Sequence, residues 1–358
     1  MALHFHPLTV KKIKRETPDC VSISFTIPGE LQKEFTFKQG QSLTLRKTLQ
    51  GEEIRRSYSI CTSPLDNELR VAIKQVQGGL FSTFANTTLQ PGDVLDVMPP
   101  SGKFYTELDP SNKKNYVAFA AGSGITPIIS LIKTTLQTEP QSNFTLVFGN
   151  KNHLSIIFKE ELEALKDKYI ERFRLVHILS RERMEAEINY GRINSDKCLQ
   201  LTKLINLNNA DEFFICGPEE MIFSVRDFLN DKGFDKRKIH FELFTTPLRK
   251  ASSYKPQVAS ETSNETSEIT VTLDGRSFDF NLDYDSNNIL DAALAQGADL
   301  PFACKGGVCT TCKAKLIEGQ IEMEVNYGLE PDEVEAGFIL TCQSHPRSEK
   351  VVVDFDVK

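Results

Sequence analysis

The sequence predicts a multidomain protein with three folded parts. These are an antiparallel β-barrel over residues 1–110, an α/β domain with a parallel sheet over residues 111–247 and a small β-rich domain over residues 267–358, with a linker over residues 248–266. Three observations support this prediction: short alternating strands fill the first part, apolar strands alternate with helices in the second, and four of eight cysteines lie in the last 55 residues. The 358 residues suit two or three domains of about 150 residues each.

The first part is predicted to contain six strands. Each is a short run with period-two alternation or many β-branched residues, and turn residues such as Pro91-Gly92-Asp93 separate the runs. Six antiparallel strands within about 100 residues favour a small barrel. The predicted strands are His4–Thr9, Val21–Ile27, Ser42–Arg46, Ser57–Thr62, Glu68–Gln77 and Val94–Met98.

From Tyr116 onward, apolar strands alternate with longer helical segments. This alternation predicts βαβ units, in which each helix returns the chain to the same edge of a parallel sheet. The predicted strands are Val117–Ala121, Phe144–Phe148, Phe173–Leu179, Glu212–Cys216 and Ile239–Phe244. The first predicted helix follows the glycine-rich turn and ends near Leu136, and the other three cover Phe158–Tyr169, Cys198–Ile205 and Glu219–Asn230.

The linker and the last domain differ in composition. Residues 248–266 are rich in Ser, Thr and charged residues and have no periodicity, which is typical of a flexible linker. Beyond it we expect a hairpin, one helix and a closing strand. These elements are Glu268–Leu273 and Ser277–Leu282 around Asp274-Gly275, then Ile289–Gln296, then Lys350–Phe355.

Charge is unevenly distributed along the chain. Residues 267–358 contain 17 acidic and 7 basic side chains and carry −10, whereas the whole chain carries −7, so the first 266 residues carry +3. Phosphate backbones require a positive surface, so nucleic acid is disfavoured as a partner. An acidic domain favours a positively charged protein partner. Acidic residues that only keep a small domain soluble explain the asymmetry equally well.

The sequence predicts no membrane partner and a cytoplasmic location. No uninterrupted apolar run reaches ten residues, against the about 20 needed to span a bilayer. The segment Met1–Pro7 lacks the basic and apolar stretches of a secretory signal. A disulfide framework is unusual in that setting, so the clustered cysteines predict metal ligation or redox chemistry.

The cysteine cluster has a specific spacing. Four residues separate Cys304 from Cys309, two separate Cys309 from Cys312, and 29 separate Cys312 from Cys342. This is the plant-type spacing of a [2Fe–2S] cluster. Two glycines between the first two cysteines allow the backbone to approach the sulfurs closely. A four-cysteine zinc site is the alternative, although such sites usually use two paired knuckles and Cys342 stands alone.

The segment Arg-Ser-Tyr-Ser at positions 56–59 ends a predicted barrel strand. Alternation along a strand places Arg56 and Tyr58 on one face. That face offers a guanidinium to a pyrophosphate and an aromatic ring to a flat heterocycle, and Ser59 can donate to a ring nitrogen. Strands often carry Arg and Tyr for other reasons, so this motif supports a flavin-type site only together with the glycine-rich turn that follows it.

A glycine-rich turn that opens a short helix follows at positions 78–82, which read Gly-Gly-Leu-Phe-Ser. Gly79 and Ser82 lie at the helix N-terminus, where free amides form a natural phosphate site. A helix that simply caps the barrel is the structural alternative, and both roles are compatible.

The first parallel strand is followed by a second glycine-rich turn. Gly122 and Gly124 allow a pyrophosphate to approach, Thr126 can cap the next helix, and Pro127 suits its first turn. The turn departs from the G-x-G-x-x-G fingerprint. Cys216-Gly217 ends another parallel strand at the same sheet edge, although a buried, inert cysteine is the commoner fate of such a residue.

Taken in this order, the motifs resemble the ferredoxin–NADP⁺ reductase superfamily with a C-terminal plant-type ferredoxin, over essentially the whole chain. Residues 304–312, 326–331 and 337–344 are further similar to the reductase subunits of phenylacetyl-CoA epoxidase complexes. The resemblance implies an FAD-binding β-barrel, an NAD(P)-binding α/β domain and a β-grasp-like [2Fe–2S] ferredoxin domain.

The resemblance also implies roles for single residues. Ser59, Cys216 and Glu242 are the expected catalytic residues, and the four clustered cysteines are the expected cluster ligands. The expected flavin contacts are Arg56 with the pyrophosphate, Tyr58 with the ring, Ser59 near N5, Gly79 and Ser82 with a phosphate, and Phe244 near the flavin; the expected nucleotide contacts are Gly122, Gly124, Thr126, Pro127, Ser180, Arg181 and Gly217.

Ser180-Arg181 follows the third parallel strand, where the adenosine ribose is expected. An arginine there can neutralise a 2′-phosphate, whereas an acidic residue would bind the free hydroxyls of NADH. The pair is similar to the NADPH-selecting pair of the family. We expect NADPH as the donor, with NADH still open because Arg181 can also be a solvated residue in a loop with Glu182 and Arg183.

These expectations combine into one function. Electrons pass from NAD(P)H to FAD, to the [2Fe–2S] cluster and then, by resemblance, to the di-iron subunit of an oxygenase, with phenylacetyl-CoA epoxidase favoured. A reductase that serves a different multicomponent oxygenase and a non-catalytic zinc-binding scaffold are the alternatives. FMN in place of FAD also stays open, because a related phthalate-type reductase with the same domain order uses FMN.

Overall fold

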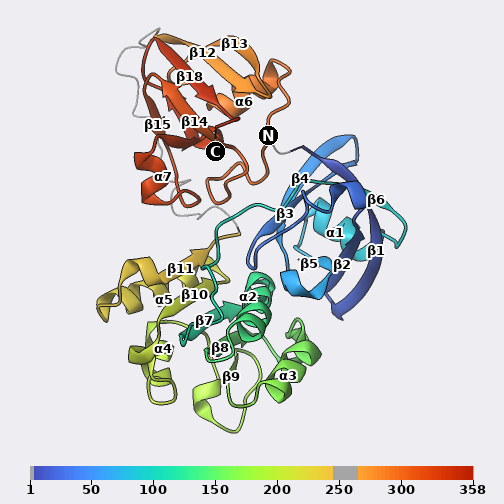
Figure 1. Cartoon of the computed structure of the whole chain (residues 1–358), viewed down its shortest axis with the longest axis vertical. Helices are drawn as coiled ribbons and strands as arrows, with labels where there is room; N and C mark the ends of the chain where they lie inside the picture. Colours follow the sequence, from blue (N-terminus) through green and yellow to red (C-terminus); the bar gives the residue numbers. More distant parts are fainter. Residues whose placement is uncertain (1–3, 245–264, 358) are drawn as a thin grey trace. The chain divides into compact units, whose positions relative to one another are not determined.

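The computed structural model describes residues 4–244 and 265–357. They belong to two compact units, one covering His6–Leu243 and the other covering Phe244–Lys358 together with the residues up to Phe5 (Figure 1). Most of the predicted linker lies outside the described residues, and Thr266, which we expected at its end, already begins a strand. Within the described ranges, no helix is both long and apolar enough to cross a membrane.

The first sheet is antiparallel and closes into a barrel. Its elements are β1 (His6–Thr17), β2 (Cys20–Thr26), β3 (Ser42–Leu49), β4 (Glu52–Ser59), β5 (Leu69–Lys74), β6 (Val94–Val97) and helix α1 (Leu80–Thr87). The strand order is β4-β3-β6-β1-β2-β5, and an antiparallel bridge between Ile60 and Val71 joins the two edges. The expected strand at 57–62 is displaced: β4 pairs with β3 from Glu52 and ends at Ser59.

The second sheet is parallel throughout. It contains β7 (Asn115–Ala121), β8 (Asn143–Asn150), β9 (Phe173–Leu179), β10 (Glu212–Cys216) and β11 (Ile239–Glu242), with helices α2 (Ile125–Thr138), α3 (Lys159–Lys168), α4 (Ser195–Leu201) and α5 (Glu219–Asp231). The order β11-β10-β7-β8-β9 means that the chain builds outward from β7 in one direction and then the other. The carboxyl ends of β7 and β10 therefore flank the topological switch point, where open α/β sheets bind ligands.

The barrel and the parallel sheet share one hydrophobic core. Cys61 and Phe104 from the barrel side belong to the same buried cluster as Ile128 and Phe214 from the α/β domain. The rings of Phe104 and Phe214 meet edge to face, with centroids 5.4 Å apart. The two domains therefore pack as one body.

Polar contacts reinforce this packing. The Arg70 guanidinium at the start of β5 donates to both carboxylate oxygens of Glu161 in α3, at 2.9 and 3.1 Å. Lys133 of α2 reaches the same carboxylate at 2.8 Å. The Ser130 hydroxyl of α2 donates to the carbonyl of Thr62 at 2.6 Å. The start of β5 and the segment before it are thus hydrogen-bonded to two helices of the α/β domain.

The second unit contains a mixed sheet of the β-grasp type. Its elements are β12 (Thr266–Leu273), β13 (Arg276–Asp283), α6 (Ile289–Ala295), β14 (Lys313–Glu318), β15 (Ile321–Met323), α7 (Pro331–Glu335), β16 (Phe338–Leu340), β17 (Ser344–Pro346) and β18 (Lys350–Asp354). The order is β13-β12-β18-β14-β16, with β12 and β18 parallel and the other pairs antiparallel. Ile289 and Leu290 of α6 are buried in the same core as Val351 and Val353 of β18.

Candidate functional site

The four clustered cysteines come together in the second unit. Cys304, Cys309 and Cys312 lie on the loop between α6 and β14, and Cys342 lies in the turn after β16. The Cys304 thiol is within hydrogen-bonding reach of Cys309 and Cys342, and Cys342 is also within reach of Cys312. The sulfurs are therefore neighbours in series. The plant-type spacing of these four cysteines favours a [2Fe–2S] cluster over one zinc ion.

Backbone geometry and hydrogen bonds shape the cysteine loop. Lys305 adopts a positive φ of 51° and Gly307 one of 73°. A Cβ on Gly307 would lie 2.8 Å from the carbonyl oxygen of Val325, so only glycine fits there. The Gly306 N–H donates to Cys304 Sγ at 3.3 Å. Such donors stabilise charge on the cluster sulfurs.

One supporting residue was not predicted from the sequence. The Gln343 side-chain amide donates to the carbonyl of Cys342 at 2.7 Å and to that of Lys305 at 3.2 Å, and its nitrogen lies 3.6 Å from Cys342 Sγ. It thereby connects the two segments that carry the cysteines. Its position next to Cys342 is the only signal in the sequence that could have identified it.

A ring contact brings the two predicted flavin motifs together. Tyr58 on β4 packs against Phe81 of α1, with ring centroids 5.7 Å apart. Arg56, two residues earlier on β4, is exposed. The Ser82 hydroxyl accepts a hydrogen bond from the Val76 N–H at 3.1 Å and donates to the carbonyl of Gly79 at 3.2 Å. Ser82 therefore holds the turn that positions the first amides of α1.

The three predicted catalytic residues also lie together. The Ser59 hydroxyl at the end of β4 donates to Glu242 Oε2 at 3.0 Å, and Glu242 pairs with Cys216 in the parallel register of β10 and β11. Burial raises the pKa of Glu242 from 4.5 to about 7, although the hydrogen bond from Ser59 opposes this rise. Burial raises the pKa of the Cys216 thiol, and the nearby Glu242 adds to that effect. Cys216 is therefore an uncharged thiol and Glu242 a group that changes charge near neutrality.

The glycine-rich turn after β7 packs directly against the end of β10. A Cβ on Gly124 would lie 2.0 Å from the carbonyl oxygen of Cys216, and one on Gly217 would lie 2.7 Å from Met221 Cε. Gly122 has a positive φ of 54°. Glycine is required here because the ends of β7 and β10 approach so closely.

The predicted capping role of Thr126 is wrong. Gly124 is the N-cap of α2 and forms no side-chain cap, whereas the Thr126 hydroxyl donates to the carbonyl of Ser123 at 3.0 Å. Thr126 and Pro127 are both buried, while Gly122 and Ser123 are partly exposed. The accessible part of the turn is therefore at Gly122 and Ser123, and the buried side chains of Thr126 and Pro127 pack beneath it.

Arg181 is presented at the edge beyond β9. The Ser180 N–H donates to the carbonyl of Asn150 at 2.9 Å, and the Arg181 N–H donates to that of Lys151 at 2.8 Å, so the chain here continues alongside the end of β8. Arg181 is exposed. Phe244 begins the second unit and is 41% exposed, so its predicted role at the flavin stays a prediction.

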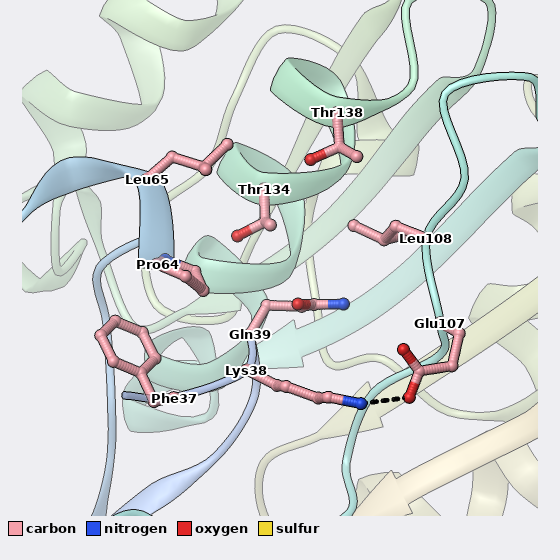
Figure 2. Close-up of a pocket in the computed structure, with 9 residues that line it drawn as sticks. All are labelled: Phe37, Lys38, Gln39, Pro64, Leu65, Glu107, Leu108, Thr134 and Thr138. Carbon is pink, nitrogen blue, oxygen red and sulfur yellow. Dashed lines mark hydrogen bonds and ion pairs between the residues drawn. The ribbon is translucent and has the colours of Figure 1, made fainter. Parts of the chain in front are cut away.

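A pocket elsewhere in the first unit takes no part in this arrangement. It lies between the barrel and α2, and the ion pair between Lys38 and Glu107 borders it (Figure 2). None of the predicted site residues lines it. The lining residues are Phe37, Lys38, Gln39, Pro64, Leu65, Glu107, Leu108, Thr134 and Thr138.

Comparison with known families agrees with the three domains. The model of the oxidoreductase FAD-binding domain matches residues 7–105, that of the oxidoreductase NAD-binding domain matches residues 119–227, and that of the 2Fe–2S iron–sulfur cluster binding domain matches residues 271–347. The cofactors are accordingly FAD, a [2Fe–2S] cluster and a pyridine nucleotide donor. The zinc scaffold and FMN alternatives find no support in these matches.

Relatives share the whole arrangement. The chain is 46% identical to one of the subunits of 1,2-phenylacetyl-CoA epoxidase from Escherichia coli, over 99% of this chain and 98% of that protein. It is 33% identical to the ferredoxin reductase component of 3-ketosteroid-9-alpha-monooxygenase from Rhodococcus rhodochrous, over 97% and 96%. The solved structure of phthalate dioxygenase reductase has the same fold, with a TM-score of 0.59, 21% identity and coverage of 98% of both chains.

The order of the domains, the convergent cysteines and these relatives lead to one assignment. The chain belongs to the ferredoxin–NADP⁺ reductase superfamily, in the branch of oxygenase reductase components that join an FAD-binding domain, an NAD-binding domain and a C-terminal [2Fe–2S] ferredoxin domain.

Proposed function

We propose that this reductase delivers electrons from NADPH to the di-iron oxygenase subunit of a phenylacetyl-CoA epoxidase in the cytoplasm. The observation that carries this proposal is the 46% identity to the Escherichia coli epoxidase component across nearly the full length of both proteins. None of the eight cysteines, all within the described residues, forms a disulfide, which fits a reducing compartment. The acidic ferredoxin domain fits a basic docking surface on the oxygenase.

A reductase for a different oxygenase is the second candidate. Reductase components of 3-ketosteroid-9-alpha-monooxygenase and of glycine betaine monooxygenase are 33% and 30% identical over nearly the whole chain. Reconstitution separates the candidates: the purified reductase is combined with the oxygenase subunits of each system, and NADPH-dependent oxidation of phenylacetyl-CoA, a 3-ketosteroid and glycine betaine is measured. Product from phenylacetyl-CoA alone supports the proposal, and product only in another system contradicts it.

The residues of the first unit suit both nucleotides. Arg56 and Tyr58 on β4 and the turn around Gly79 would hold FAD, while the turn at 122–124 and Cys216-Gly217 would hold the nicotinamide. When bound, FAD supplies the conversion of a two-electron hydride donor into single electrons for the cluster. The chain itself contributes close backbone approach, orientation and exclusion of water.

We further propose that Glu242 holds a proton at this site. A partly buried carboxyl group with a pKa of about 7 changes its protonation state near neutral pH. Ser59 donates to one of its oxygens and so fixes its orientation at the end of β11. The pair can therefore take up or release a proton beside the reacting groups without large movement.

Replacing Glu242 by glutamine should remove a pH dependence. The carboxyl group is protonated below a pH of about 7 and ionised above it, so the rate of FAD reduction by NADPH in the wild-type protein should fall as pH rises from 6 to 8. Glu242→Gln keeps a neutral hydrogen-bonding group and should give a flat profile, measured by stopped-flow absorbance. If the pH profile of FAD reduction in Glu242→Gln kept the inflection of the wild-type profile, Glu242 would not be the group that holds the proton.

The free energy of unfolding should also fall as pH rises. The folded-state pKa of Glu242 lies above its ordinary value of 4.5, so the folded protein binds more protons than the unfolded chain between these values. This group therefore lowers the free energy of unfolding as pH rises from about 4.5 to about 7. Glu242→Gln should reduce that slope in denaturant titrations.

Replacing Arg181 by alanine should selectively weaken use of NADPH. Loss of a charged contact to the 2′-phosphate is worth about 1.5–3 kcal/mol, so KM for NADPH should rise roughly tenfold or more, while KM for NADH changes little. Steady-state kinetics with both nucleotides on the same preparation measure the split. Equal effects on the two nucleotides would mean that Arg181 is a solvated surface residue that does not select between them.

A further inference from the structure

Two opposite charges stand next to each other where the adenosine ribose is expected. Arg181 is exposed, and the described residues give its side chain no ion-pair or hydrogen-bond partner. Glu182 follows it directly. At this place in a dinucleotide site a carboxylate favours the ribose hydroxyls of NADH, whereas an arginine accommodates the 2′-phosphate of NADPH. A Glu182 carboxylate without a partner would therefore favour NADH and oppose the preference for NADPH that Arg181 provides.

Glu182 is not free, because His153 binds its carboxylate twice. The backbone N–H of His153 donates to Glu182 Oε2 at 2.9 Å, and His153 Nδ1 lies 2.8 Å from Oε1 and 2.9 Å from Oε2. These hydrogen bonds lower the pKa of Glu182, with a smaller contribution from Lys159. The carboxylate is thus ionised and its oxygens are occupied.

The turn that carries His153 is itself well held. Asn152 Oδ1 accepts the N–H of Ser155 at 3.1 Å, and Ser155 Oγ accepts the N–H of Asn152 at 3.1 Å. This reciprocal pair is a capping box, which fixes the first residues of the turn. His153 therefore offers both of its donors to Glu182 from a defined position.

Backbone pairing fixes the other side of the contact. The N–H groups of Ser180 and Arg181 donate to the carbonyls of Asn150 and Lys151, so this segment is tied to the end of β8. Residues 180–182 form a bend after β9. The backbone of Arg181 is thus fixed beside the end of β8 and the Glu182 carboxylate is fixed at His153, whereas the Arg181 side chain is exposed.

We propose that His153 is a specificity-determining positioning residue, which withdraws Glu182 from the nucleotide and leaves Arg181 as the charge that meets the ribose. His153 thereby strengthens the preference for NADPH over NADH without touching either nucleotide. The inference rests on the proposed role of Arg181 and deepens it, because it explains how an acidic neighbour is tolerated.

The experiment compares four proteins loaded with FAD and the cluster: wild type, His153→Ala, Glu182→Gln and the double variant. The ratio of kcat/KM for NADPH to that for NADH should fall about threefold to fivefold in His153→Ala, the size of an exposed charge effect. Glu182→Gln should keep or raise the ratio, and the double variant should return to the wild-type value. Only a freed carboxylate explains that rescue.

A binding measurement makes the test independent of turnover. Calorimetric titration with 2′,5′-ADP and 5′-AMP should show weaker binding of 2′,5′-ADP alone in His153→Ala. His6→Ala is the matched control, because His6 forms a comparable pair with Glu34 in the barrel, with Nε2 2.9 Å from the carboxylate. In His6→Ala, the ratio of kcat/KM for NADPH to that for NADH and the ratio of affinities for 2′,5′-ADP and 5′-AMP should both be unchanged.

The outcomes separate this inference from the proposal beneath it. An unchanged preference in His153→Ala, or a double variant as impaired as His153→Ala, would overturn the role of His153. A wild-type protein that binds 2′,5′-ADP no better than 5′-AMP would overturn the role of Arg181, and the inference with it.

Discussion

Replacement of Cys312 by serine should abolish electron delivery to cytochrome c while leaving reduction of FAD by NADPH intact. Cys312 is buried and its thiol is next to Cys342 in the series of four sulfurs, so its loss removes one of the ligands on which a [2Fe–2S] cluster depends. Apart from Phe244, the predicted FAD and nucleotide contacts lie in the other unit and do not involve this residue. Stopped-flow reduction of FAD and steady-state reduction of cytochrome c measure the two halves separately.

Cys198→Ser provides the matched control. Cys198 is also fully buried, but it lies in α4 of the α/β domain. That variant should keep both activities, the iron content and the visible absorption of the cluster. If Cys312→Ser instead lost FAD reduction together with cytochrome c reduction, the two units would not act as separate redox modules.

Replacement of Gly124 by alanine should strongly reduce both the stability and the activity of the first unit. The added Cβ would lie 2.0 Å from the carbonyl oxygen of Cys216 and 2.7 Å from the nitrogen of Gly217, and these are backbone atoms that cannot rotate away. Such overpacking costs about 1–3 kcal/mol and occasionally more. The ends of β7 and β10 would have to separate, so NADPH-dependent FAD reduction should fall roughly a hundredfold.

Gly29→Ala is the control, because a Cβ there has no neighbour within 4 Å and the residue does not require a positive φ. Chemical denaturation and stopped-flow kinetics should show no loss for Gly29→Ala and a combined loss for Gly124→Ala. Wild-type kinetics in Gly124→Ala would mean that the spacing between β7 and β10 does not position the nicotinamide.

Sequence patterns predicted the strands of the parallel sheet best. β9 and β10 begin and end where expected, and in β10 this is because an apolar run buried on both faces follows a polar residue. The barrel strands were displaced by up to several residues, since bulges and long hairpins extend β1 and β4 beyond their alternating segments. The elements β14 to β17 and α7 were not predicted. Three of them have only three residues, too few for any periodicity to emerge.

The candidate site, like the fold, could be predicted from the sequence only in part. The spacing of the cysteines predicted four ligands of a [2Fe–2S] cluster, and the structure brings these four thiols near one another. The contact between Ser59 and Glu242 joins residues 183 positions apart, and only resemblance to a family suggested it. Gln343 and His153 escaped prediction altogether, because each acts through hydrogen bonds that depend on where distant turns come to lie.

The attachment between the barrel and the α/β domain limits how such reductases can be recombined. Thr62 lies between β4 and β5 and Arg70 lies in β5, whereas their partners Ser130 and Glu161 lie on α2 and α3. A chimera with its crossover at residue 110 would inherit each half of these pairs from a different parent. Engineers who wish to exchange coenzyme preference should therefore transplant the stretch from the end of β4 through β5 along with the nucleotide domain, or alter single residues instead.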